Sequence, residues 1–141
     1  MNQIENKQEF LSLCYHYLRP EKTADSFPRI LGSTLEEFEE QVKMLQKQYQ
    51  IISLDDIKKF IQKKTNFTKI GMLFTFDDGL SDHFEAAKIL SKYGISGVFY
   101  IPTCILENEP ANPNIIHYCL AIYGVSRFIS EYNFCINKFE L

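Results

Sequence analysis

The residues in this sequence best suited to catalysis or metal binding are two adjacent aspartates, Asp77 and Asp78, which stand between an apolar run and Gly79. The run, residues 71–76, predicts a strand buried on both faces. The aspartates therefore fall at the carboxyl end of a strand, where ligands bind in open α/β sheets and β/α barrels. Two ionised carboxylates this close repel each other, so one must hold a proton or a cation must lie between them. A divalent metal on one aspartate, with the other as base for a metal-bound water, meets both conditions.

A structural interpretation competes with this catalytic one. Asp-Gly commonly ends a strand, and aspartate is a common N-cap of a following helix. Gly79 can take a positive φ, which lets the chain turn at once into a helix predicted over residues 82–93. Local sequence leaves both interpretations open, although the alternation of side chains along an extended segment favours unequal roles for Asp77 and Asp78.

The elements that position the aspartates alternate between strand and helix. Apolar runs predict strands over residues 10 to about 19, 50–52, 71–76 and 97–102, the first largely buried and the last buried. Helices are expected over residues 35–49, 54–63 and 82–93. Thr34 and Ser53 are the expected caps of the first two, and Gly94 is the expected end of the third. This order predicts an α/β fold of parallel β/α units, in a sheet or barrel.

The last quarter of the chain has a different character. Residues 115–123 are apolar nearly all round, which predicts a fully buried helix. The apolar residues that follow, from Phe128 to Leu141, suggest that further sequence or a partner surface covers them. The four cysteines lack CxxC spacing and are expected to be buried free thiols: Cys14, Cys104, Cys119 and Cys135.

The three histidines are widely spaced and receive separate interpretations. His16, at the end of the first strand, could line the same mouth as Asp77. His83 falls in the first turn of the helix over 82–93, where a surface or structural role is expected. His117 stands on the apolar helix, where a hydrogen-bonded core histidine is expected.

Composition restricts the class of protein. With 141 residues, the chain is expected to form one domain, residues 1–141, with a polar tail at 1–9. A net charge of −3 provides no field for nucleic acid, so no nucleic-acid partner is expected. No stretch approaches the ~18 apolar residues of a membrane span, and the polar opening predicts a cytoplasmic location.

Four segments resemble the polysaccharide deacetylases, the NodB-homology superfamily. They are LFTFDDG at 73–79 with KYGISGVFYIP at 92–102, CYHYL at 14–18, and FPRILGSTLEEFEEQVKMLQKQYQIISLDDI at 27–57. The resemblance spans about residues 10 to 105. It implies a distorted β/α barrel and a metal-dependent hydrolase that removes N-acetyl groups from a glycan or sugar.

The resemblance also implies roles for particular residues. Asp77 matches the catalytic base and Asp78 the metal-binding aspartate. Apart from the resemblance, which assigns no role to His16, the residues His16, Thr75 and Gly79 are candidates to line the site. The metal implied is a divalent ion, usually zinc, which polarises the acetamide carbonyl and acidifies its bound water.

The sequence departs from this family in one important respect. The pair of histidines in the motif H-[ST]-x-x-H, which completes the metal site, is absent from these 141 residues. Zinc sites normally have at least three protein ligands, so the site is expected to be incomplete. We therefore expect a truncated, N-terminal part of the domain that is inactive by itself. The alternatives are a non-catalytic fragment, or a receiver-like regulatory module that binds a divalent cation through the acidic pair.

Overall fold

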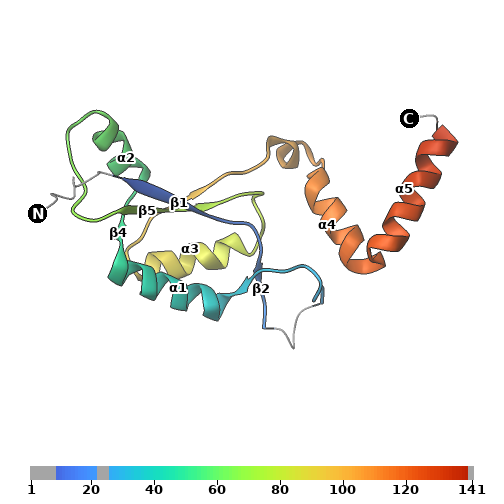
Figure 1. The fold of residues 1–141 in the computed structure, drawn as a ribbon, viewed down its shortest axis with the longest axis horizontal. Helices are drawn as coiled ribbons and strands as arrows, with labels where there is room; N and C mark the ends of the chain where they lie inside the picture. Colours follow the sequence, from blue (N-terminus) through green and yellow to red (C-terminus); the bar gives the residue numbers. More distant parts are fainter. Residues whose placement is uncertain (1–8, 22–25, 140–141) are drawn as a thin grey trace, which may run out of the picture.

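The computed structural model describes residues 9–21 and 26–139, so the tail expected at 1–9 lies outside it apart from Glu9. A parallel sheet of four strands forms the centre (Figure 1): β1 (Phe10–Tyr15), β4 (Gln50–Ile51), β5 (Gly71–Phe76) and β6 (Gly97–Phe99). β1 pairs with the whole of β5, while β4 and β6 pair with its beginning and its end. A second, two-stranded sheet joins β2 (Leu18–Arg19) to β3 (Ser33–Thr34). The predicted parallel α/β fold is confirmed; the described strands form an open sheet, and a closed barrel stays a prediction.

The helices between these strands begin and end at the local signals expected of them. α1 (Leu35–Gln48) and α2 (Leu54–Ile61) each start with a capping box, at Thr34 and Ser53. After α3 (His83–Lys92), Gly94 takes a φ of 67° and the Ile95 N–H donates to the Leu90 carbonyl at 2.9 Å. This is the Schellman ending that the sequence predicts.

The larger core lies between the sheet and the helices α1 and α3. Met72, Phe74 and Phe76 of β5 point into it, together with Tyr15 of β1 and Phe38 of α1. Phe74, Phe76 and Phe38 are fully buried. Since side chains alternate along a strand, the intervening residues of β5 face the opposite side of the sheet.

A smaller core covers part of that opposite side. Leu73 packs there with Ile52 and with Ile57 of α2. The expectation that β5 is buried on both faces is thus confirmed. For β1 the expected burial is wrong: only its last residue, Tyr15, is buried, because β1 is an edge strand of the described sheet. β6 is half-buried rather than buried.

The start of α3 holds the chain where it leaves β1. The Leu18 N–H donates to Asp82 Oδ2 at 2.8 Å, and His83 Nε2 lies 2.5 Å from the His16 carbonyl oxygen. His83 is 4% exposed and must donate through Nε2, because a carbonyl only accepts. Among the described residues nothing bonds its Nδ1. The structural role expected for His83 is confirmed, and Asp82 bonds another segment instead of capping its own helix.

The C-terminal part leaves the sheet and forms two consecutive helices (Figure 1). After a 3₁₀ turn, Thr103–Glu107, come α4 (Asn112–Tyr123) and α5 (Val125–Phe139). The expectation of a fully buried helix is wrong, since α4 has no buried residue, although it contacts the segment around Phe27 and Arg29. Large apolar side chains of α5 are exposed, and what covers them stays a prediction. Across residues 9–21 and 26–139, no helix combines the length and apolarity needed to cross a bilayer.

Tyr15 provides a test of the core that positions the site. Burial raises the pKa of its phenol to about 12 from an ordinary value near 10. Between those values the unfolded chain loses the proton and the folded chain keeps it, so the free energy of unfolding falls as pH rises through this window. Tyr15→Phe should remove this loss, about 2 kcal/mol at the upper end, in denaturant unfolding measured from pH 9 to 12. Tyr118→Phe, at an exposed tyrosine of α4, is the control; equal alkaline slopes in wild type and Tyr15→Phe would contradict the assignment.

Asp82 provides a test of the link between β1 and α3. Asp82→Ala leaves the N–H of buried Leu18 without its acceptor, which should lower the free energy of unfolding by about 1–3 kcal/mol. Glu85→Ala on the same helix removes only a surface ion pair with Lys88 and should change stability by less than about 0.5 kcal/mol. Urea unfolding of the two variants measures the difference, and equal effects would show that the bond to Leu18 is not what Asp82 contributes.

Candidate active site

The pairing of β1 with β5 brings four polar side chains to one face at the carboxyl end of the sheet. The parallel register sets Cys14 opposite Thr75 and Tyr15 opposite Phe76. Because side chains alternate, Cys14 and the following His16 share a face with Thr75 and the following Asp77. Tyr15 and Phe76 turn to the other face and stack there, with ring centroids 5.4 Å apart.

The closest approach is among Cys14, His16 and Asp77. Their ligand atoms all lie within 4.8 Å of one another, and no other group of three such residues is found within the described ranges 9–21 and 26–139. Cys14 Sγ lies 3.9 Å from His16 Nδ1, and His16 Nε2 lies 3.9 Å from Asp77 Oδ2. The side chains of His16 and Asp77 are 52% and 40% exposed, so solvent and ligands reach them. Thr75, beside them, is buried, and its hydroxyl lies 3.3 Å from the Leu13 carbonyl oxygen. The functional roles predicted for His16, Thr75 and Asp77 stay predictions.

Cys14 corrects the expectation of buried thiols. Cys14 and Cys135 are exposed, and Cys104 and Cys119 are half-buried. Partial desolvation raises the pKa of the Cys14 thiol, and its hydrogen bond to Asp77 and the charges of Asp77 and Asp78 raise it further, against a lowering by Thr75. Without a cation, desolvation and the acidic neighbours both favour the protonated thiol.

Asp78 faces a different set of groups from Asp77. Its carboxylate Oδ2 accepts from Asn114 Nδ2 of α4 at 3.3 Å. The backbone of Asp78 has a φ of 78° and that of Gly79 a φ of 60°, so both occupy the left-handed region. Gly79 takes the positive φ that the sequence predicts, and a Cβ there would lie 3.1 Å from Ile101. This turn sends the two neighbouring carboxylates to separate partners.

Hydrogen bonds continue from Asp78 across the start of α4. Asn114 Nδ2 also donates to the Tyr17 hydroxyl at 2.9 Å, and that hydroxyl lies 3.0 Å from His117 Nδ1. His117 is exposed and bonded to Tyr17, so the expectation of a core histidine is wrong. Sequence reasoning missed Tyr17 and Asn114, because their meeting depends on how α4 returns to the end of β1.

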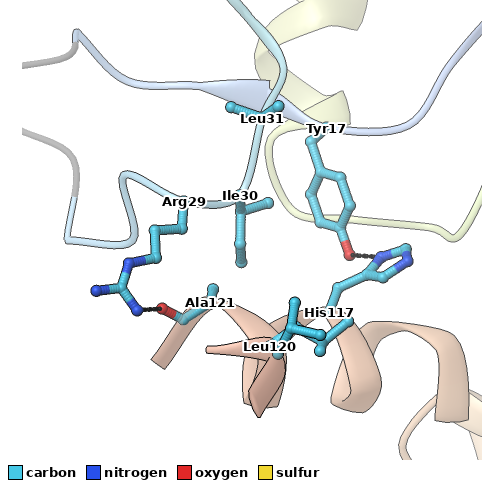
Figure 2. A pocket seen from close by; sticks show the side chains of 8 residues that line it. Tyr17, Arg29, Ile30, Leu31, His117, Leu120 and Ala121 are labelled. Atoms are coloured by element: carbon cyan, nitrogen blue, oxygen red, sulfur yellow. Dashed lines mark hydrogen bonds between the residues drawn. The ribbon is translucent and has the colours of Figure 1, made fainter. Parts of the chain in front are cut away.

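A pocket opens beside this chain of hydrogen bonds, between α4 and the segment around residue 30 (Figure 2). Its volume is about 400 Å³, and Tyr17 and His117 line one side while Arg29 lines the other. Arg29 Nη1 donates to the Ala121 carbonyl near the end of α4 at 3.1 Å. The remaining lining is mostly apolar, including Ile30 and Leu120. A ligand here would meet an apolar surface with polar groups at its edges.

The donors present favour one kind of metal ion. Thiolate, imidazole and carboxylate together suit zinc or a similar borderline ion, whereas magnesium prefers oxygen ligands alone. Within residues 9–21 and 26–139, Asp78 belongs to no group of three Cys, His, Asp or Glu ligands. Its metal-binding role stays a prediction.

Comparison with known proteins gives matches only at the level of structure. No family model matches the sequence, and no curated protein matches it significantly. The structure of IcaB from Ammonifex degensii has 23% identity and a TM-score of 0.54, covering 67% of this chain and 38% of that chain. A de-N-acetylase from Aggregatibacter actinomycetemcomitans has 20% identity and a TM-score of 0.59, covering 70% and 39%. The Streptococcus pyogenes deacetylase PplD, in complex with acetate, has 22% identity and a TM-score of 0.51, covering 71% and 44%.

These matches define what the chain shares with known structures. The chain spans less than half the length of each of the three structures. The matching part is about two thirds of the present chain or slightly more. The resemblance to the polysaccharide deacetylases is therefore confirmed as a shared fold.

Proposed function

We propose that this chain carries the acidic-pair part of a metal-dependent hydrolase that removes N-acetyl groups from a glycan. The observation that carries the proposal is the position of Asp77 and Asp78 at the carboxyl end of buried β5, in a fold shared with deacetylases. Two carboxylates at an accessible sheet edge provide what such a hydrolysis needs from the protein: a proton acceptor and an anchor for a cation.

The resemblance gives the two aspartates unequal roles, and their surroundings support unequal roles. Asp77, 40% exposed, is the proposed base that takes a proton from the attacking water. His16 Nε2 lies 3.9 Å from the Asp77 carboxylate. Asp78 is the proposed metal ligand, with its carboxylate oriented by Asn114. The ion, when bound, polarises the acetamide carbonyl.

The ligands that would complete the proposed centre at Asp78 are not within these 141 residues. The three histidines at positions 16, 83 and 117 form no H-[ST]-x-x-H pair, and His83 is committed to the His16 carbonyl. We therefore propose that this chain binds an N-acetylated glycan at the mouth of the sheet but does not hydrolyse it alone.

Glycan binding is the direct test. N-acetylglucosamine oligomers should shift the backbone amide NMR signals of residues 16 and 77–79 in the isotope-labelled chain. Glucose oligomers of equal length, which carry a hydroxyl in place of each acetamido group, should bind about tenfold more weakly, equivalent to about 1.4 kcal/mol. Asp77→Asn should reduce this discrimination, and Glu85→Gln on the outer face of α3 should leave it unchanged.

Two results would contradict the proposal. One is equal affinity for the two oligomers, and the other is a set of shifted signals that excludes residues 16 and 77–79. Acetate release is measured in the same samples: we expect none above that of Asp77→Asn. Release that depends on Asp77 would support the hydrolase while correcting the expected inactivity of this chain.

A further inference from the structure

The three side chains that converge at the mouth of the sheet are not those that the resemblance assigns to a metal. Cys14, His16 and Asp77 have ligand atoms within 4.8 Å of one another, whereas Asp78 bonds Asn114 instead. We propose that Cys14, His16 and Asp77 form a zinc-type metal site in this chain, with the Cys14 thiolate as a ligand and Asp77 as a ligand rather than a base.

The three groups lie near one another but must move closer to hold one ion. Ligand atoms at 2.0–2.3 Å from a zinc ion lie roughly 3.5 Å from one another. Cys14 Sγ lies 3.9 Å from His16 Nδ1, and Asp77 Oδ2 lies 3.9 Å from the other ring nitrogen, Nε2. The imidazole binds through one nitrogen, and with one atom from each residue the three ligand atoms lie within 4.8 Å of one another. Rotations of the exposed side chains therefore have to shorten the widest separation by about an ångström to bring three donors onto one ion.

The backbone beneath these side chains is already fixed. The Asp77 N–H donates to the Tyr15 carbonyl at 3.0 Å, which locks the spacing of the two strand ends. Thr75 bonds the Leu13 carbonyl, and His83 bonds the His16 carbonyl from below. Only side-chain torsions therefore need to be ordered when an ion binds, and this lowers the entropic cost of forming the site.

The chemistry of the donors selects the ion. Binding releases the Cys14 proton to solvent as the sulfur–metal bond forms, so a divalent ion gains one thiolate and one carboxylate. The imidazole completes a mixed sulfur, nitrogen and oxygen set, which suits Zn²⁺ or Co²⁺ and discriminates against Mg²⁺. Asp78, the next residue after Asp77 but outside the cluster, adds negative charge that attracts the cation.

The proposed site concerns ion binding alone, so it can be tested without the proposed hydrolysis. An Asp77 carboxylate that is bound to the ion cannot take a proton from water at the same time. Occupancy of the three-residue site and action of Asp77 as a base are therefore mutually exclusive states of the same side chain.

Cobalt is the probe, because a thiolate bound to Co²⁺ gives a charge-transfer absorption band in the near ultraviolet that oxygen and nitrogen ligands do not give. The full chain is titrated with Co²⁺ under a non-thiol reductant, and Zn²⁺ is then added in competition. We expect the band to appear at one equivalent, Zn²⁺ to remove it, and excess Mg²⁺ to leave it. An ion held by Asp78 alone would produce no such band.

The variants assign the ligands. Cys14→Ser should abolish the band, while His16→Gln and Asp77→Asn should weaken Zn²⁺ binding at least tenfold, the lower end of what altered metal-site partners cost. Asp78→Asn and Cys135→Ser, which changes the other exposed cysteine, should keep the band. Far-ultraviolet circular dichroism checks that each variant is folded, and the serine exchange at exposed Cys14 conserves shape.

Three results would overturn the proposal. The first is no band in the wild-type chain at saturating Co²⁺. The second is a band that survives Cys14→Ser, which would place the thiolate at another cysteine. The third is loss of the band in Asp78→Asn with retention in Asp77→Asn, which would return the ion to the aspartate that the resemblance implies. Glycan binding can persist or fail in each case, so the proposed function stands or falls separately.

Discussion

The parallel, in-register pairing of β1 with β5 is the constraint on which the candidate site depends. Because side chains alternate, a shift of one residue would turn Cys14 and His16 into the core and expel Tyr15. Tyr15 prevents this, since its ring stacks on Phe76 and meets Phe38 edge to face at 5.0 Å. A buried aromatic ring on one face of the sheet thus determines which polar groups meet on the other.

The mouth of the sheet concentrates negative charge, and this has two consequences. Partial desolvation raises the pKa of the Cys14 thiol and the negative charge raises it further, which makes the free thiol a poor nucleophile near neutral pH. The same field favours a divalent cation, since an ion that binds there offsets the charges of Asp77 and Asp78 at once. A thiol that is protonated without metal and ligating with metal is the expected behaviour of such a group, because metal and proton compete for the sulfur.

The sequence predicts those parts of the fold that local chemistry decides. The capping boxes at Thr34 and Ser53 and the glycine ending at Gly94 depend on contacts within a few residues, and each helix bound they predict is close to the observed one. Burial on both faces of β5 also follows from its own apolar run. The predictions that were wrong concern burial that depends on distant neighbours: β1 lies at an edge, and α4 has no buried residue.

The candidate site likewise has one part that local sequence could have predicted and one part that depends on distant segments. The alternation in Cys14-Tyr15-His16, set beside Thr75-Phe76-Asp77, would have predicted the cluster if both strands were assumed to end at one edge of the sheet. No comparable signal exists for Asn114, which lies 36 residues after Asp78 and reaches it through the path of α4.

The contact with α4 restrains Asp78 less than the strand pairing restrains Asp77. A partly exposed hydrogen bond such as Asn114 to Asp78, at 3.3 Å, contributes about 0.5–1.5 kcal/mol at most. The left-handed backbone at Asp78 costs a comparable roughly 1–2 kcal/mol for a residue with a Cβ, although aspartate tolerates it better than most. Asp77 instead directly follows β5, which has a continuous ladder of backbone hydrogen bonds to β1 and packs against a buried core. The two adjacent carboxylates therefore differ in rigidity, and the fixed one is the better preorganised ligand while the other is freer to follow α4.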